Sequence, residues 1–336
     1  MRAVAAIPRA PGSARLCDFP DPPCSAGEVL VRVLECGLCA TDCDIHAGRA
    51  GEAALPGEAL ILGHEVLGRV AASGSGVVGF GPGDLVVATV RRPCGCSNCS
   101  ASEIDMCTSE TAPERGIRRR HGFLAEYFVE QPAFLVRVPR TLRAVAVLLE
   151  PLSVAEKAVF QVQAVQRRMR WQPERALILG TDTIALLAAM LLRVQGLEVT
   201  VCTDDRPDSL AARWLADLGV GRAPRAGLPG MTGAFDLILD RAGRDAALAA
   251  RVLAPGGVLC CVERPLHAAV RGNQVAIASA GAHLRDYERG VAHLAEFEVR
   301  WPGLAARLVT RRLPLDAFQQ ALEPAPEHIK TVISLA

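Results

Sequence analysis

A histidine and a glutamate stand side by side at His64 and Glu65, in the stretch LILGHEVLGRV. Both side chains can bind a metal ion. Neighbouring residues of a strand point to opposite faces, so two neighbours reach one ion only where the backbone bends. Gly63 and Gly68 flank the pair, and glycine permits such a bend. Because most isolated His-Glu pairs are ordinary polar neighbours, a metal site requires further ligands elsewhere in the chain.

Two other segments supply such ligands. Upstream, ECGLCATDCD offers the thiolate of Cys39 and the hydroxyl group of Thr41, and downstream LLEPLSVAEKA offers the carboxylate of Glu150. A catalytic zinc ion takes Cys, His and carboxylate ligands and keeps one position for water or substrate. The three segments together therefore predict a catalytic zinc. Whether Glu65 or Glu150 binds the ion directly or through water stays open, and Glu150 could instead simply open a helix before Pro151.

A zinc ion in such a site would support the oxidation of an alcohol. The ion polarises the alcohol oxygen and lowers its pKa, so that the alkoxide forms near neutral pH. The hydroxyl group of Thr41 both donates and accepts hydrogen bonds and can pass the proton outward. Loss of hydride from the same carbon requires a nicotinamide held beside the ion.

A second group of possible zinc ligands lies between residues 94 and 107, where four of the twelve cysteines gather. In a reducing cytosol such clustering indicates metal binding rather than disulfides. The first two cysteines of the group are separated by one residue, and they can still bind a tetrahedral ion if the loop kinks at Gly95. The predicted ligands of this structural zinc are Cys94, Cys96, Cys99 and Cys107. The alternative is a vestigial loop of free thiols.

The length of 336 residues favours two domains over one. Half of the residues are apolar and the net charge is +1, which argues against a nucleic-acid-binding surface or a disordered tail. No signal-like segment opens the chain, and no apolar stretch reaches the length of a membrane span. We therefore expect a soluble, cytoplasmic protein that acts on a small molecule, without nucleic-acid or membrane partners.

The pattern of predicted secondary structure changes near residue 150. Residues 1–150 contain short strands broken by Gly and Pro, which is typical of a β-barrel-like domain with long loops. Residues 151–284 alternate strands and helices, which predicts a parallel sheet with helices on both faces. The segment 285–336 ends in a short apolar strand that can complete the first domain. The predicted fold class is α/β with these two domains.

Five motifs resemble those of one known family: GLCATD, GHEVLGRV, VRRPCGCSNC, ERGIRRRHGFLAEY and EPLSVAEKA. The family is the zinc-dependent medium-chain dehydrogenases/reductases of the alcohol dehydrogenase superfamily, and the most similar branch is prokaryotic glucose 1-dehydrogenase. The resemblance implies a GroES-like catalytic domain, a Rossmann domain that binds NAD(P), and a homodimer or homotetramer. It implies that Thr41 relays the substrate proton and that Glu114 contacts a sugar hydroxyl, although Glu114 could equally be an ordinary surface residue. It also gives the catalytic zinc four neighbours: Cys39, His64, Glu65 and Glu150.

The nucleotide-binding fingerprint departs from the pattern of that family. After the strand ALILG, Gly180 is in place, but Asp182 stands where a second glycine lets the backbone approach the pyrophosphate. A carboxylate there adds bulk and sets negative charge against two phosphates. The family's EATG has become Asp240–Gly243, and an expected Asn is absent from Ser279–Ala282. The residues that we expect to bind the cofactor are Gly180, Asp182, Thr183, Asp204, Arg206 and Gly243.

The preference between NAD and NADP depends on Asp204, which follows Gly180 by 24 residues at the end of the next strand. An acid at this point binds the ribose hydroxyls of NAD and repels the extra phosphate of NADP. Only Arg206 stands nearby to offset it, so the sequence favours NAD.

Three functions remain open at this point. The predicted function is a zinc-dependent oxidoreductase that moves a hydride between a sugar- or polyol-like alcohol and NAD(P). Because the departures all lie on the cofactor side, a non-redox zinc enzyme is the alternative, namely a lyase, isomerase or cyclase on a hydroxylated metabolite. The third is an inactive structural homologue. Six further histidines lack ligand-like companions, and we expect them to be structural or exposed: His46, His121, His267, His283, His293 and His328.

Overall fold

The computed structural model describes residues 1–243, 246–266, 270–323, 325 and 327–335, so that His267 lies outside the described residues. The contacts divide the chain into two compact units. The first unit comprises Met1–Glu150, His283–Val291 and Val309–Ala336, and the second comprises Pro151–Ala282 and Ala292–Leu308. The sequence assigned all of 285–336 to the first domain, whereas the contacts place Ala292–Leu308 with the second unit.

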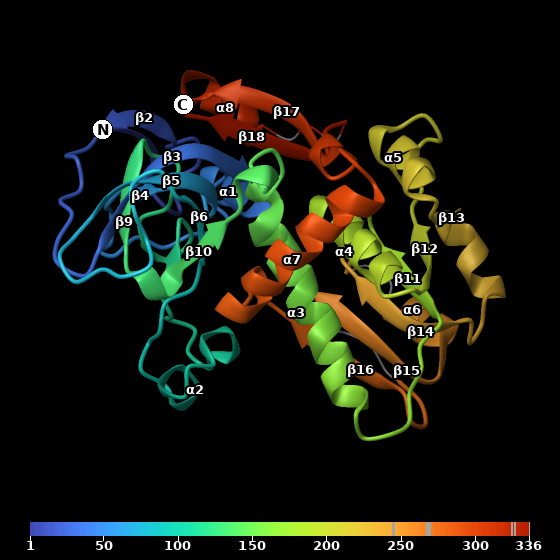
Figure 1. Ribbon diagram of the computed structural model, residues 1–336. Helices are drawn as coiled ribbons and strands as arrows, with labels where there is room; N and C mark the ends of the chain where they lie inside the picture. Colours follow the sequence, from blue (N-terminus) through green and yellow to red (C-terminus); the bar gives the residue numbers. More distant parts are fainter. Residues whose placement is uncertain (244–245, 267–269, 324, 326, 336) are drawn as a thin grey trace. The chain divides into compact units, whose positions relative to one another are not determined.

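The first unit is built mainly from β-sheet (Figure 1). Its largest sheet has the strand order β10-β6-β5-β3-β18-β17, and β9 pairs with β3 as well. A three-stranded sheet has the order β2-β1-β4, and β7 pairs with β8. The strands are β1 Arg2–Ala6, β2 Arg15–Asp18, β3 Val29–Leu38, β4 Leu60–Ile61, β5 Glu65–Ser73, β6 Leu85–Ala88, β7 Glu114–Arg115, β8 Arg119–Arg120, β9 Tyr127–Glu130, β10 Leu135–Val138, β17 Val309–Pro314 and β18 Lys330–Ser334.

The helices of the first unit are short, and they add a few side chains to its core, such as Ile45 of α1 and Phe318 and Leu322 of α8. These helices are α1 Ala40–His46, α2 Ser97–Ser100 and α8 Phe318–Leu322, together with the 3-10 helices η1 Ile104–Met106, η2 Pro132–Phe134, η3 Arg140–Leu142, η4 Ala146–Leu148 and η7 Leu315–Ala317. Most of the core comes from the inward faces of the strands. On β3, for example, Val31 and Val33 are fully buried while Arg32 between them is exposed, as the two-residue period of a strand requires.

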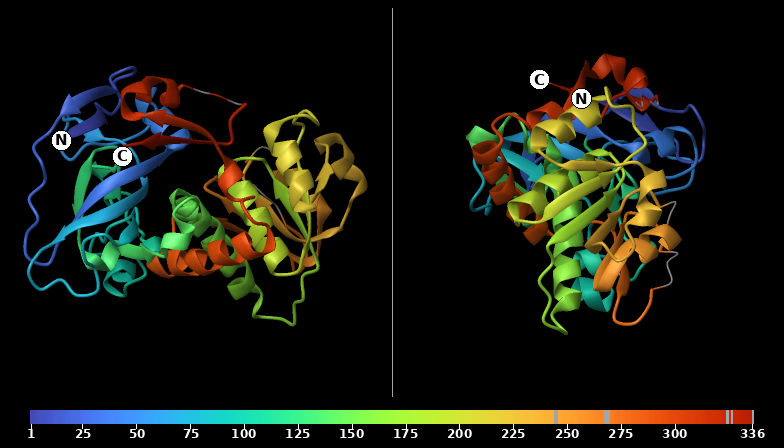
Figure 2. Two further views of the ribbon diagram at one scale, coloured as in Figure 1. Left: turned by 45° about the horizontal axis from the view of Figure 1, so that its top comes forward. Right: turned by 90° about the vertical axis from the view of Figure 1, so that its right-hand side faces the viewer.

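The last strand of the chain lies beside one of the first. Strand β18 pairs antiparallel with β3, with Val332 opposite Gly37 and Thr331 opposite Leu38. Figure 2 shows the red C-terminal strand next to the blue β3. Because Lys330 opens β18, this pairing carries its side chain to the end of β3 that leads into α1.

The second unit is a parallel sheet with helices packed against it (Figure 1). The strand order is β13-β12-β11-β14-β15-β16, and every pair is parallel. The order reverses between β11 and β14, which is where doubly wound sheets bind nucleotides. The strands are β11 Arg175–Leu179, β12 Glu198–Cys202, β13 Gly221–Ala223, β14 Phe235–Asp240, β15 Leu253–Val262 and β16 Val275–Ser279.

The helices of this part of the chain are α3 Leu149–Gln166, α4 Thr183–Val194, α5 Leu210–Leu218, α6 Ala246–Val252 and α7 Leu284–Arg300, with η5 Arg225–Gly230 and η6 Ala306–Leu308. Helices α4 and α5 begin at side-chain caps, Asp182 and Ser209, whose oxygens accept from Ala185 N and Ala212 N. Within the described part of the chain, no helix combines the length and the apolar character that crossing a membrane requires.

Candidate active site

Three of the predicted zinc ligands converge in the first unit. The ligand atoms of Cys39, His64 and Glu65 all lie within 4.8 Å of one another. The Cys39 Sγ atom is 3.2 Å from His64 Nε2, and His64 and Glu65 are both buried. A thiolate, an imidazole and a carboxylate at one point are a donor set that zinc accepts. The residues present therefore fit the ion that the sequence predicted.

The bend that brings His64 and Glu65 together comes from Gly63 alone. Gly63 has a φ of +83°, and a Cβ added there would lie 2.5 Å from Cys36 Sγ. His64 is the last loop residue and Glu65 opens β5. The sequence expectation for Gly68 was wrong, because Gly68 lies inside β5 without a positive φ. Its missing side chain instead makes room for Val31 on the neighbouring strand.

A buried carboxylate that the sequence reasoning missed connects the two ligand segments. Asp42, which is fully buried in α1, accepts hydrogen bonds from Cys39 N and from Gly63 N, each at 3.0 Å. The oxygen bound to Gly63 also lies 3.7 Å from His64 Nδ1. The Cys39 sulfur in turn accepts from Thr41 N at 3.3 Å and caps α1. Asp42 therefore ties the Cys39 segment to Gly63 by hydrogen bonds and sets a negative charge behind the His64 ring, whose Nε2 atom faces Cys39.

Glu65 has a cation partner that the sequence reasoning also missed. Lys330 Nζ forms an ion pair with the Glu65 carboxylate and donates to Leu38 O at 3.0 Å. Both charged side chains are only 3% exposed. Burial lowers the pKa of Lys330, but the negative charges of Glu65 and Cys39 raise it by more. The pKa of Lys330 therefore lies above its ordinary value. Lys330 therefore carries a positive charge beside the ligand set.

Glu150 lies outside the group of three but close to it. It stands in the first turn of α3 and is buried. Burial lowers the pKa of His64, whereas Cys39, Asp42 and Glu150 raise it, and the net pKa is well above its ordinary value. The negative charge that stabilises a protonated ring also favours a metal cation at the same place.

Glu114 forms an ion pair with an arginine, and its segment packs near the loop that carries His64. Arg91 donates to Glu114 Oε1 from Nε at 2.9 Å and from Nη2 at 2.7 Å. Gly116, two residues further on, packs against the loop that carries Gly63 and His64, because a Cβ added at Gly116 would overlap the Gly63 carbonyl. Glu114 is thus a member of an ion pair rather than a lone carboxylate, which the motif ERGI did not indicate.

The four clustered cysteines also converge. Their sulfurs all lie within 4.8 Å of one another, with Sγ–Sγ distances of 3.3 Å for Cys94–Cys107, 3.8 Å for Cys96–Cys107 and 3.9 Å for Cys94–Cys99. Four thiolates around a tetrahedral zinc are about 3.8 Å apart, so the arrangement fits that ion. Gly95 has a φ of +87°, which is the kink that the short Cys94–Cys96 spacing required.

Two features prepare this loop for a metal. The backbone N–H groups of Cys99 and Thr108 lower the pKa of Cys96 to about 5, which favours the thiolate that binds zinc. The loop is also anchored to the start of α7, where Arg285 pairs with Glu103 at 2.6 Å and His283 Nε2 lies 2.8 Å from Ser102 O.

Two outcomes concern the remaining histidines. His293 Nδ1 lies 2.6 Å from Glu156 Oε1, and His121 Nδ1 accepts from Ile61 N at 3.2 Å, so both serve local structure. His283, which we expected to be structural or exposed, contacts Ser102 O and also has acidic neighbours that the sequence did not indicate. Glu103, Asp105 and His283 place their ligand atoms within 4.8 Å of one another, although Arg285 already pairs with Glu103.

In the second unit, the unusual Asp182 has an arginine partner. Arg241 donates to Asp182 Oδ2 from Nε at 2.9 Å and from Nη2 at 2.6 Å. The other oxygen of Asp182 accepts from Ala185 N at 2.9 Å and caps α4. A Cβ added at Gly180 would lie 3.4 Å from Arg241 Cβ. The carboxylate that the sequence sets against the phosphates is therefore paired with a cation from the neighbouring strand end.

The two acidic residues after β12 accept hydrogen bonds from different partners. Asp204 Oδ1 accepts from Arg225 N at 3.0 Å, whereas Asp205 Oδ2 accepts from the Thr181 hydroxyl at 2.8 Å. The carboxylate against the fingerprint loop is thus that of Asp205, one residue beyond the predicted Asp204. Arg206 pairs with Asp208 at 2.6 Å.

The two other predicted cofactor residues stand at the same edge of the sheet. Thr183 begins α4 and is buried. Gly243 has a φ of +65° and donates from its backbone N to Asp240 Oδ1 at 2.8 Å, just past the end of β14.

Comparison with known proteins places the chain. A model of the alcohol dehydrogenase GroES-like domain matches residues 25–140, and a model of the glucose dehydrogenase C-terminus matches residues 143–335. The glucose 1-dehydrogenase of Methanocella arvoryzae is 38% identical and that of Thermoproteus tenax is 40% identical, each over 100% of this chain and 99% of the relative. The chain belongs to the glucose dehydrogenase branch of the alcohol dehydrogenase superfamily.

Solved structures agree with this family. The glucose dehydrogenase of Haloferax mediterranei, solved in complex with NADP, Zn and gluconolactone, has a TM-score of 0.89 at 26% identity, over 100% of this chain and 99% of that chain. The cobalt- and zinc-bound alcohol dehydrogenase of Pyrobaculum aerophilum has a TM-score of 0.82 at 25% identity, with the same coverage. The predicted resemblance, the α/β fold class and the predicted enzyme class of a dehydrogenase are thereby confirmed. The family favours the redox prediction over a non-redox enzyme or an inactive homologue.

Proposed function

We propose that this dehydrogenase oxidises a sugar- or polyol-like alcohol with zinc bound in the first unit and NAD bound to the second. The observation that carries the proposal is the convergence of Cys39, His64 and Glu65 on one point. The glucose 1-dehydrogenases among its relatives support a hydroxylated substrate. The site is therefore proposed to act on a carbon that bears a hydroxyl group.

Cys39 and His64 would hold the zinc, and Glu65 and Glu150 are the carboxylates available to complete its ligands. When bound, zinc supplies Lewis acidity that lowers the pKa of a coordinated alcohol. Thr41 stands two residues after Cys39. Its Oγ1 atom would accept the proton that the alcohol releases and pass it to water. Lys330 positions the Glu65 carboxylate and offsets part of the negative charge of the ligand set.

NAD is proposed as the cofactor because acids stand where NADP would place its extra phosphate. The Asp205 carboxylate lies against the fingerprint loop through Thr181, and Asp204 precedes it directly. Arg206, the nearby cation in the sequence, is engaged by Asp208. A ribose hydroxyl can donate to a carboxylate, whereas a phosphate is repelled by it.

Arg241 would make the fingerprint usable despite Asp182. The bidentate pair neutralises the carboxylate, and the guanidinium group adds a cation at the end of β14, beside Gly180. A pyrophosphate at the start of α4 would then meet a neutral pair and the helix N-terminus rather than an isolated negative charge. Gly180, Thr183 and Gly243 complete the proposed cofactor edge.

Three finer points belong to the same proposal. Glu114 would contact a substrate hydroxyl as a pair with Arg91, which supplies donors beside the carboxylate acceptor. The chain would form a homodimer or homotetramer, since β16 ends the parallel sheet and leaves an edge available for pairing. Its twelve cysteines are free, as in the reducing cytoplasm where we propose that it acts.

Cofactor choice is tested by calorimetric titration of the zinc-loaded protein with NAD and with NADP. We expect NAD to bind more tightly, and we expect replacement Asp205→Ser to reduce the preference by about tenfold, or about 1.4 kcal/mol. Glu198→Ser is the matched control, because it removes one exposed acid at the start of β12, at the end of the strand that lies away from the fingerprint. A tighter affinity for NADP in the wild-type protein would overturn the NAD proposal, and no binding of either up to millimolar concentrations would overturn the redox function.

The substrate class is tested by following NADH formation with a panel of aldoses, polyols and simple alcohols. We expect turnover with hydroxyl-rich substrates and little with ethanol. Glu114→Gln should raise KM for the best sugar more than it lowers kcat, because the residue binds rather than reacts. An enzyme that prefers ethanol, with KM unaffected by Glu114→Gln, would contradict the sugar assignment.

A further inference from the structure

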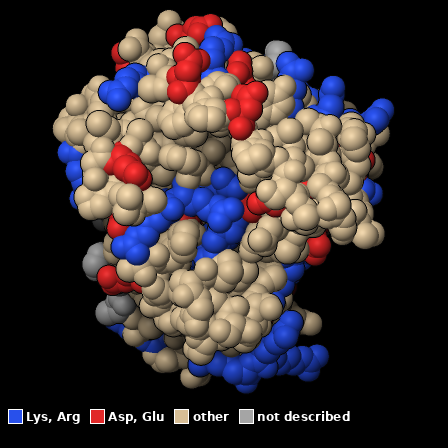
Figure 3. Space-filling model, turned by 90° about the vertical axis from the view of Figure 1, so that its left-hand side faces the viewer, with Lys and Arg blue, Asp and Glu red and all other residues tan. Residues whose placement is uncertain are grey.

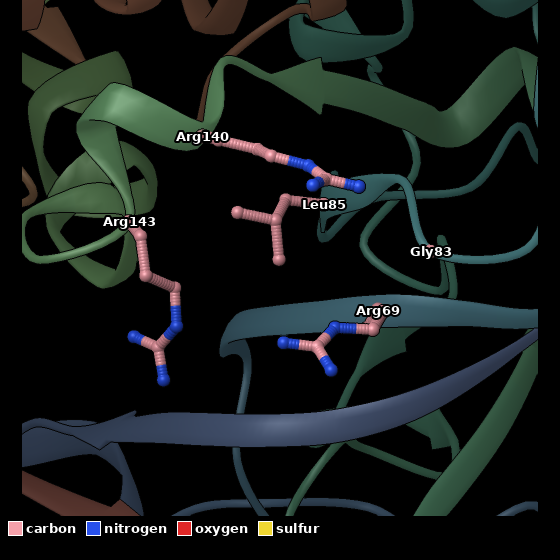
Figure 4. A pocket seen from close by; sticks show the side chains of 5 residues that line it. All are labelled: Arg69, Gly83, Leu85, Arg140 and Arg143. Carbon is pink, nitrogen blue, oxygen red and sulfur yellow. The ribbon is translucent and has the colours of Figure 1, made fainter.

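A basic pocket opens in the first unit, built from residues other than the metal ligands and the predicted substrate residue. It is a cavity of about 330 Å³ lined by Arg69, Gly83, Leu85, Arg140 and Arg143. Lys and Arg side chains gather in a hollow on one face of the molecule (Figure 3), and Figure 4 shows this pocket from close by. Its lining contains three cations and no acidic residue.

The strand register explains why these cations share one face. Arg32 on β3 lies opposite Arg69 on β5, Arg69 lies opposite Leu85 on β6, and Leu85 lies opposite Val138 on β10. Residues directly opposite in a sheet project from the same face. Arg140 follows Val138 by two residues at the start of η3. One row across four strands thus leads into the helical turn that carries the remaining arginines.

The three guanidinium groups lie around Leu85 in the pocket, and those of Arg69 and Arg140 belong to exposed residues that a ligand can reach. In Figure 4, the Arg69 and Arg143 guanidinium groups lie on one side of Leu85, and the Arg140 guanidinium group lies on the other side. The Arg140 Nη2 atom lies 3.9 Å from the Cβ position of Gly83. Because glycine stands there, no side chain covers this end of the cavity.

The charges in the pocket are mostly uncompensated. Among the residues that the structure describes, the Arg69 and Arg140 guanidinium groups have no hydrogen-bond or ion-pair partner. Arg143 Nη1 donates to Glu35 Oε1 at 3.0 Å, and the same oxygen also binds Arg312 at 2.7 Å. A single carboxylate therefore serves two arginines. The chain as a whole has a net charge of only +1, so the concentration of cations is local.

Arginines held close together repel one another, and like charges directly opposite in a sheet are destabilising. Such an arrangement suits an anion that several guanidinium forks bind at once, since each fork offers paired N–H donors to phosphate or carboxylate oxygens. A phosphoryl monoester carries about −1.5 to −2 charges, more than a carboxylate. A cavity of about 330 Å³ falls in the range of small-molecule sites rather than that of a single ion.

We propose that the pocket formed by Arg69, Arg140 and Arg143 binds a small molecule with two or more phosphoryl groups. Such a ligand would place one phosphoryl group between Arg69 and Arg143 and another against Arg140. Free oligophosphates and bisphosphorylated sugars share this chemistry. The pocket shares no residue with the proposed zinc and NAD sites, so the proposal goes beyond the proposed function.

The test is isothermal titration of the full-length, zinc-loaded protein with tripolyphosphate and, separately, with a sugar bisphosphate, both in the presence of saturating NAD. The saturating NAD occupies the other place where a pyrophosphate group could bind. We expect saturable binding of at least one probe, weakened by added salt because exposed charges are screened. Binding of tripolyphosphate alone would assign an oligophosphate, and tighter binding of the sugar bisphosphate would assign a phosphorylated sugar.

The double replacement Arg69→Gln with Arg140→Gln removes the two unpartnered cations and leaves the Arg143–Glu35 pair intact. We expect it to weaken binding by at least about tenfold, the scale of losing charge-assisted hydrogen bonds. The matched control is Arg15→Gln with Arg213→Gln, which removes two exposed arginines and the same net charge elsewhere. Circular dichroism and zinc content confirm that each variant folds. No binding by the wild-type protein up to millimolar concentrations, or equal weakening in both double variants, would overturn the proposal.

Discussion

Each of the two units contains a carboxylate–cation ion pair at its proposed ligand-binding site, and the two pairs differ in burial. In the first unit, the Glu65 carboxylate pairs with Lys330, and both side chains are 3% exposed. In the second unit, the Asp182 carboxylate pairs with Arg241, and these side chains are 43% and 11% exposed. Each carboxylate stands where a ligand of the enzyme is proposed to bind, and each cation comes from a distant segment.

The difference in burial decides what each pair contributes. Removing one partner of a buried ion pair leaves an uncompensated charge in a poorly solvated place and is strongly destabilising. An exposed pair is screened by water and adds little to the stability of the fold. We infer that the Lys330 pair is part of the folded framework of the metal site, whereas the Arg241 pair mainly tunes the charge that a cofactor meets.

The replacement Lys330→Met is the strongest way to break this comparison. In the metal-free protein it buries the Glu65 charge without a partner, and we expect the free energy of unfolding to fall by about 3–5 kcal/mol. Denaturant unfolding measures the change. The double variant Lys330→Met with Glu65→Gln should recover most of the loss, because it also removes the unpaired charge. A single variant as stable as the wild-type protein would show that Glu65 is neutral or solvated in the fold.

The four-cysteine loop sharpens the comparison, because four sulfurs gathered at one point bind as thiolates when a zinc ion is present. We expect the wild-type protein to bind about two zinc ions and Cys96→Ser to bind about one, with a lower unfolding temperature and the catalytic ion retained. Elemental analysis and thermal unfolding measure both effects. Cys17→Ser, a half-buried free cysteine on β2, is the control. Equal zinc content in Cys96→Ser and Cys17→Ser would leave the loop as free thiols.

The smallest effect on stability should come from the second unit. Arg241→Ala should change the free energy of unfolding by less than about 1 kcal/mol, yet weaken NAD binding by about tenfold, because the Asp182 charge would then face the pyrophosphate. Combining it with Asp182→Gly should restore most of the affinity. Calorimetry on the four proteins of this cycle measures the coupling. If the two replacements have independent effects on NAD affinity, Arg241 does not act by neutralising Asp182.

The sequence predicted the parts of each site that come from local chemistry. Cys39, His64 and Glu65 could be recognised because zinc accepts few residue types and the motifs are short. The kink at Gly95 followed from the spacing of two cysteines. The alternation of strands and helices after residue 150 predicted the parallel sheet, since each period has a direct structural meaning.

The missed residues are those whose partners are chosen by tertiary structure. Lys330 stands 265 residues from Glu65, and only the pairing of β18 with β3 brings them together. Arg241 reaches Asp182 because β11 and β14 are neighbours in the sheet. Asp42 carried a weak local signal, an acid three residues after Cys39 at the start of a helix, which is the pattern of a cap. The acid that contacts the fingerprint loop is Asp205 rather than Asp204. Sequence spacing alone does not show which of two neighbouring loop residues points toward that loop.

The central claim is that Cys39 and His64 hold the zinc that the alcohol oxidation requires. The most direct measurement is zinc K-edge absorption spectroscopy on Cys96→Ser, where the catalytic ion is the one expected to remain, compared with the same protein carrying Cys39→Ser. We expect the first protein to show a zinc with one sulfur neighbour and nitrogen or oxygen neighbours, and the second to lose this zinc together with its dehydrogenase activity. An unchanged zinc spectrum and unchanged activity after Cys39→Ser would contradict it.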